Sequence, residues 1–122
     1  MIKFKYVIML WVYIALASGC ATPTALRTTK PSLKLISEKS AKIVSTCIAN
    51  KWENLGLFGV TIPVNMRPTE LGFTLSVRNE VWGHTQLLAD VIEEKLGSST
   101  LYFKGAVIGT SSFDHAVEVC QN

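Results

Sequence analysis

The amino-acid sequence predicts an α+β domain, an antiparallel sheet of about four strands with an N-terminal and a C-terminal helix on one face. Three observations support this fold class. Apolar residues recur with three-and-four spacing over 35–55, which is typical of an amphipathic helix. Apolar and polar residues alternate over 60–66 and 73–77, as in half-buried strands. Cys47 and Cys120 lie on the apolar faces of the two expected helices, so a disulfide can join them.

The two helices have sequence signals at their ends. The first is expected over 35–55, with Ser37 as its N-terminal cap and Gly56 at its end. The last begins after a cap at Ser111 or Ser112. Its apolar face is formed by Phe113, Ala116, Val117 and Cys120.

The strands are defined less sharply. Pro63 has no amide donor, which places strand 60–66 at a sheet edge or at a bulge. Residues 84–92 fit either a strand or a short helix. The strand is favoured because a Gly-Ser-Ser turn within 93–99 leads to a hairpin partner at 100–104.

The composition fits one domain preceded by an apolar segment. The chain has 122 residues, is 48% hydrophobic and 17% charged, and has a formal net charge of +3. Fifteen of the first 19 residues are hydrophobic, and without 1–19 the net charge falls to +1. A chain that near neutral gives no support for nucleic-acid binding or for a polybasic membrane patch. Its hydrophobic share, about 43%, is ordinary for a globular domain and too high for disorder.

The N-terminal segment has the order of a secretory signal peptide. Two lysines lie within 1–5, twelve apolar residues follow at 6–17, and residues 17–19 are small. A membrane-spanning helix needs about 20 apolar residues, so this run is too short to be one.

The end of this segment resembles the lipobox of bacterial lipoproteins. Residues 16–19 read Leu-Ala-Ser-Gly and precede Cys20, where the family has an invariant cysteine, although Ala17 stands where the family prefers leucine. The resemblance implies that Cys20 carries lipid, palmitate included, and becomes the new N-terminus. Ala21 follows in place of aspartate, which in lipoproteins of enterobacterial type implies sorting to the outer membrane. The alternative is an ordinary signal peptide with a chance cysteine.

These features divide the chain into three parts. Residues 1–19 are the lipoprotein signal peptide, 20–31 the lipidated N-terminus and a flexible linker, and 32–122 a single α+β domain in the periplasm. The linker contains threonine, proline and almost nothing to bury. Fully extended, it would reach roughly 36 Å and hold the domain clear of the lipid headgroups.

With Cys20 assigned to lipid, Cys47 and Cys120 remain for a disulfide in an oxidising compartment. In the chain-entropy model, closing a loop of this length contributes at most roughly 4 kcal/mol. Zinc binding is the rival interpretation. No CxxC or HxxxH spacing supports it, and both histidines lie far from these cysteines in the sequence.

The sequence predicts no catalytic residue, cofactor or metal site. GxSxG, phosphate-loop, Rossmann, EF-hand and metalloprotease motifs do not occur. His84 and Asp90 are about 20 Å apart on a straight strand, too far for contact. His115, next to Asp114 in the first turn of a helix, is interpreted as a surface residue, and the adjacent glutamates at 93–94 as solvated.

Two surfaces are candidates for protein binding. Trp82 and His84 flank Gly83 in an expected loop, and exposed tryptophans often anchor protein contacts. Alternatively, Trp82 covers the open end of the core. The second candidate is the outward face of the sheet, a mixed polar surface that is expected to suit protein contact and to be unsuited to strong binding of lipid or nucleic acid. It would comprise Thr74, Ser76, Arg78 and some of Gln86, Asp90 and Lys104.

Together these observations predict a non-enzymatic, lipid-anchored protein of the bacterial envelope, at the outer membrane and facing the periplasm. Its expected partners are the membrane, through the lipid on Cys20, and an envelope protein, with no nucleic acid and no small-molecule cofactor. It would be an accessory or structural module of an envelope assembly. One alternative is a periplasmic inhibitor or immunity protein that blocks a hydrolase such as a lysozyme through the Trp82–His84 loop. Another is a small envelope hydrolase.

Overall fold

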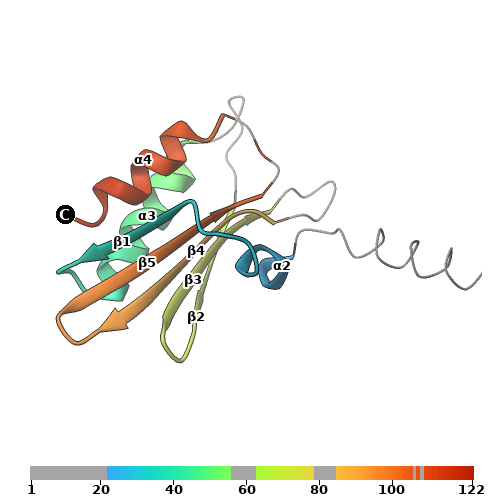
Figure 1. The fold of residues 1–122 in the computed structure, drawn as a ribbon. Coiled ribbons are helices and arrows are strands. Elements are labelled where there is room, and N and C mark those ends of the chain that lie inside the picture. Colours follow the sequence, from blue (N-terminus) through green and yellow to red (C-terminus); the bar gives the residue numbers. More distant parts are fainter. Residues whose placement is uncertain (1–21, 56–62, 79–84, 106, 108) are drawn as a thin grey trace, which may run out of the picture.

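The structure, a computed structural model, describes residues 22–55, 63–78, 85–105, 107 and 109–122. A five-stranded antiparallel sheet carries two helices on one face and a short helix on the other (Figure 1). The elements in chain order are α2 (Pro23–Arg27), β1 (Leu33–Ser37), α3 (Ala41–Leu55), β2 (Val64–Pro68), β3 (Gly72–Arg78), β4 (Thr85–Glu94), β5 (Gly97–Lys104) and α4 (Ser111–Val119). Within these ranges no helix is both long and apolar enough to cross a bilayer.

The α+β class and the antiparallel sheet are confirmed, but the strand count is five rather than four. The strands lie in the order β1-β5-β4-β3-β2, with every neighbouring pair antiparallel. The ambiguous segment 84–92 corresponds to strand β4, and 100–104 belongs to its hairpin partner β5. The strands expected at 60–66 and 73–77 correspond to β2 and β3, while residues 60–62 of the first, like residue 84 before β4, lie outside the described residues. Among the described strands β2 is at an edge of the sheet, as Pro63 suggests.

The fifth strand, β1, replaces the expected start of the first helix. Leu33 pairs with Tyr102 of β5, and the preceding amide of Ser32 donates 2.7 Å to the Tyr102 carbonyl. Leu33 and Leu35 pack against the core, whereas Ile36, assigned to the helix by its spacing, is 86% exposed. Ile36 fits the three-and-four spacing of the helix only by chance, because the segment that contains it alternates as a strand.

Helix α3 begins at Ala41 instead of near residue 35, and Ser37 is not its cap. The Oγ of Ser40 accepts a hydrogen bond from the Ile43 amide at 3.4 Å, and Glu93 of β4 accepts one from the Ala41 amide at 2.8 Å. These bonds use amides that the first turn of a helix leaves unpaired. The expected end at Gly56 lies outside the described residues.

The two larger helices are also not at the chain ends. Both α2 and β1 precede α3, and residues 120–122 follow α4. The N-cap of α4 is Thr110 rather than Ser111 or Ser112, and its side chain makes no capping hydrogen bond. The predicted apolar face of α4 is confirmed, because Phe113, Ala116, Val117 and Cys120 are all buried.

The main core lies between the sheet and helices α3 and α4. Trp52 of α3 is fully buried, and its indole Nε1 donates 3.1 Å to the carbonyl of Phe113 in α4. The Trp52 ring lies 6.0 Å from the ring of Tyr102, which is fully buried on β5. The side chain of Trp52 therefore links α3 to α4 and also packs against the sheet beneath them.

The disulfide between Cys47 and Cys120 is confirmed. Its Cα atoms are 5.7 Å apart, and it joins the middle of α3 to the residue that follows α4. The chain end is fixed further, because the carbonyl of Gln121 accepts a hydrogen bond from the Ser37 hydroxyl. The side chain of Gln121 also bonds Thr100 of β5.

Candidate functional site

The predicted binding and lipidation residues Cys20, Trp82 and His84 lie outside the described residues. Cys47 and Cys120 form the disulfide described above. The remaining surface features of the described residues are a packed N-terminal segment, a basic cavity beside it, and a groove between α3 and α4.

The expectation of a flexible linker over 20–31 is wrong for Pro23–Arg27, which form α2. Thr22 caps this helix by accepting 3.1 Å from the Ala25 amide, and Pro23 occupies its first turn. The side chain of Leu26 is 5% exposed and packs against Leu88 and Phe103 on the sheet face opposite α3 and α4. Five residues are too few for a stable isolated helix, so packing on the sheet must hold α2 together.

An ion pair also ties α2 to the sheet. Arg27 donates hydrogen bonds of 2.8 and 2.9 Å to the two carboxylate oxygens of Asp90 on β4, and a third of 3.2 Å to Thr74 on β3. The Thr74 hydroxyl in turn donates 2.7 Å to Asp90. Burial alone would raise the pKa of Asp90, but the hydrogen bonds from Arg27 and Thr74 outweigh it and lower that pKa.

A basic cavity of about 250 Å³ lies between α2 and the outer face of β2 and β3. Arginines reach it from three elements: Arg27 from α2, Arg67 from β2 and Arg78 from β3. The other lining residues are neutral, and all but one are polar: Pro23, Asn65, Thr69, Thr74 and Ser76. The electrostatic character of the cavity is therefore positive.

The outward face of the sheet includes residues that the sequence predicted there. Thr74, Ser76 and Asp90 do lie on it, as their contacts with α2 or the basic cavity show. Lys104 lies on the other face, where its ammonium donates 3.0 Å to Asp114 of α4. Phe103 also faces outward, but α2 covers it.

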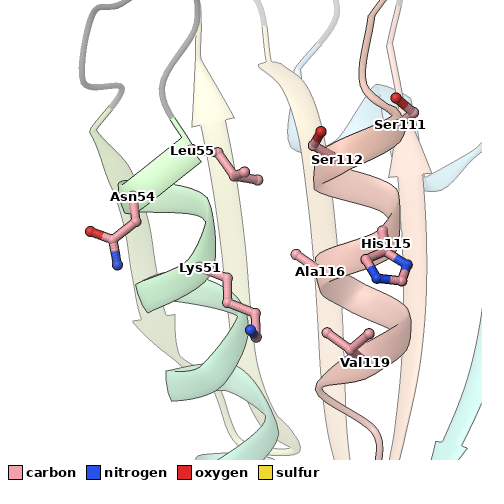
Figure 2. A pocket seen from close by; sticks show the side chains of 8 residues that line it. All are labelled: Lys51, Asn54, Leu55, Ser111, Ser112, His115, Ala116 and Val119. Carbon is pink, nitrogen blue, oxygen red and sulfur yellow. The ribbon is translucent and has the colours of Figure 1, made fainter.

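A wider groove of about 740 Å³ separates the exposed sides of α3 and α4 (Figure 2). Figure 2 shows Leu55 of α3 and Ala116 of α4 directed toward the space between the helices. Val119 adds to this apolar surface, and polar groups surround it. These polar residues are Lys51, Asn54, Ser111, Ser112 and His115.

The acidic residues near this groove and at the far end of the sheet have structural roles. Asp114 accepts 2.8 Å from the Tyr102 hydroxyl and 3.0 Å from Lys104. Burial, and then the hydrogen bond to Asp114, raise the pKa of Tyr102 far above its usual range, so the phenol remains a donor. The adjacent glutamates have different partners. Glu93 accepts a hydrogen bond from the Ala41 amide of α3, and Glu94 accepts one of 3.0 Å from the Ser99 hydroxyl.

No cluster of three or more metal-ligating side chains occurs among the described residues. Comparison of the chain with protein-family models, with curated proteins and with solved structures gave no match.

Helix α2 and the cavity beside it were not predicted from the sequence, although three of the residues that line the cavity, Thr74, Ser76 and Arg78, were expected on the outward face of the sheet. A usable signal was present, since threonine followed by proline and then Leu26 three residues later is a short helix start with one apolar residue to bury. The convergence of Arg27, Arg67 and Arg78 had no such signal, because it depends on where α2 packs.

Proposed function

We propose that this protein is a non-enzymatic lipoprotein of the bacterial envelope, anchored through Cys20, whose α3–α4 groove binds another envelope protein. The anchor part rests on the lipobox resemblance of residues 16–20. The single observation that favours the groove is that α2 begins three residues after Cys20 and packs on the sheet face opposite α3 and α4 (Figure 1).

This arrangement constrains the domain relative to a membrane. Three residues span at most about 11 Å, so a lipid on Cys20 keeps the α2 face of the sheet close to the headgroups. The opposite face, with α3 and α4, is then directed away from the bilayer. The linker expected to reach roughly 36 Å when extended is thereby replaced by a tether of at most about 11 Å with a defined orientation.

The groove has the composition of a binding surface for a protein segment. An apolar surface of Leu55, Ala116 and Val119 is bordered by polar side chains, as interfaces combine an apolar centre with a polar rim. The disulfide and the Trp52–Phe113 hydrogen bond hold the two walls in fixed positions. Binding to a rigid groove costs little conformational entropy.

A crosslinking experiment in cells tests both parts of the proposal. A photoreactive amino acid is placed at Lys51, which lines the groove, and in a control variant at Lys34, an exposed residue on the opposite face. We expect an adduct with an envelope protein from Lys51 and none from Lys34. Labelled palmitate should enter the wild type but not Cys20→Ser, in the same cells.

The unexpected outcomes are also informative. Equal palmitate labelling of Cys20→Ser would refute the anchor. Adducts from Lys34 but not Lys51 would refute the groove. An adduct that forms only from a photoreactive group at Trp82, with a secreted hydrolase as the partner, would favour the inhibitor or immunity function instead.

A further inference from the structure

The basic cavity beside α2 is chemically distinct from the α3–α4 groove. We propose that it binds the phosphate of an anionic lipid headgroup in the membrane that holds Cys20, an inference that rests on the proposed lipid anchor. Guanidinium groups match phosphate oxygens with paired hydrogen bonds, and three guanidinium-bearing residues line this one cavity.

The charges in the cavity favour an anion. Asp90 neutralises Arg27 and holds its guanidinium beside Thr74. The side chain of Arg67 makes no hydrogen bond or ion pair with another side chain that the structure describes, and Arg78 supplies the third guanidinium of the lining. Every lining residue is either neutral or an arginine, so an incoming phosphate meets no carboxylate in the lining.

The size and polarity of the cavity suit a headgroup. Its volume of about 250 Å³ is below the range of about 300–1,000 Å³ that holds drug-sized ligands. Ser76, which is 7% exposed, and Thr74 add hydroxyl groups to the lining. A phosphate group with its immediate substituent fits this description better than a large apolar molecule does.

The position of the cavity favours a membrane lipid as the source of the phosphate. Pro23 lines the cavity and is three residues from Cys20, so the two Cα atoms are at most about 11 Å apart. Anchoring at Cys20 keeps the cavity within reach of headgroups at a high effective concentration. Each arginine near an anionic surface contributes about 1 kcal/mol, roughly fivefold in affinity.

Binding is expected to stabilise α2, because Pro23 and Arg27 form one wall of the cavity. The test uses the mature lipoprotein in nanodiscs in which phosphatidylglycerol replaces increasing amounts of phosphatidylcholine. The readout is hydrogen exchange at the amides of Leu26 and Thr28, which bond the carbonyls of Thr22 and Ala25 within α2. We expect protection to rise with the phosphatidylglycerol fraction.

Two variants separate the cavity from general surface charge. Arg67→Gln should raise the phosphatidylglycerol fraction needed for half-maximal protection about fivefold. Lys34→Gln removes the same charge from the same face outside the cavity and should leave that fraction nearly unchanged. Because the hydrogen bonds that hold Arg27 to the sheet use Asp90 and Thr74 and not the Arg67 side chain, replacement of Arg67 leaves the contacts of α2 intact.

The outcomes distinguish the possible failures. No effect of phosphatidylglycerol, or equal effects in both variants, would overturn the proposal. Equal protection by millimolar inorganic phosphate in pure phosphatidylcholine discs would assign the cavity to a free anion and overturn the headgroup. The intact mass of the same sample shows whether the protein is lipidated. Loss of protection in lipidated protein would count against headgroup binding in the cavity, whereas absence of lipid would count against the anchor at Cys20.

Discussion

At the scale of single residues, the ion pair between Asp90 and Arg27 helps to hold α2 on the sheet. Its carboxylate accepts hydrogen bonds from Arg27 and Thr74, and these lower its pKa in the folded protein below the ordinary value of 3.8. A carboxylate of this kind stabilises the folded state at pH values above its unfolded pKa. That contribution is lost as the pH falls through the lower, folded pKa.

We therefore expect α2 to stay packed at neutral pH and to detach in acid, below about pH 4. The Leu26 methyl resonances, which sense Leu88 and Phe103 in the packed state, report this transition by NMR. In Asp90→Asn the ion pair is absent at every pH, so the methyl shifts should lie nearer the detached values and lose the acid transition. An unchanged transition in this variant would refute the role of Asp90.

At the scale of elements, the disulfide and the Trp52 hydrogen bond hold α3 and α4 side by side over the sheet. Both walls of the groove belong to these helices. The disulfide closes a separation of 73 residues, a loop whose closure in the unfolded chain costs much entropy.

Replacing both Cys47 and Cys120 with alanine should lower the free energy of unfolding by at most roughly 4 kcal/mol. Urea denaturation of the oxidised wild type and the double variant measures this difference. The wild type treated with reductant is the matched comparison and should approach the double variant. A difference near zero would show that the rest of the core fixes the helices without the disulfide.

Periodicity predicted the elements that bury one regular face. Strands β2 and β3 follow from alternation and the core side of α4 from three-and-four spacing, whereas β4 and β5 were favoured through the turn between them. The two cysteines that remain after Cys20 is assigned to lipid predicted the disulfide. Short elements escaped prediction. β1 has only five residues, and its pattern overlaps a helical one at Ile36.

The candidate sites were harder to predict because tertiary contacts create them. Helix α2 depends on one buried side chain, Leu26, and on an ion pair across 63 residues of sequence. Arg67 and Arg78 come to line one cavity only through the pairing of β2 with β3, and Arg27 joins that lining only after α2 packs. No local pattern encodes that convergence.

At the scale of the whole molecule, the sheet separates two surfaces of different composition. On one face, Leu26 covers a small cluster with Leu88 and Phe103, next to the basic cavity. On the other, α3 and α4 cover the main core and form the groove. With lipid on Cys20, the first surface is expected to face the membrane and the second a protein partner.

Depth measurement on the mature lipoprotein in a bilayer tests this orientation most directly. Nitroxide side chains are placed at Thr69, which lines the basic cavity, and at Lys51, which lines the groove. Their relaxation by a nickel-chelating headgroup lipid is then compared by electron paramagnetic resonance. The orientation described here predicts strong relaxation at Thr69 and weak relaxation at Lys51, and equal or reversed relaxation would contradict it.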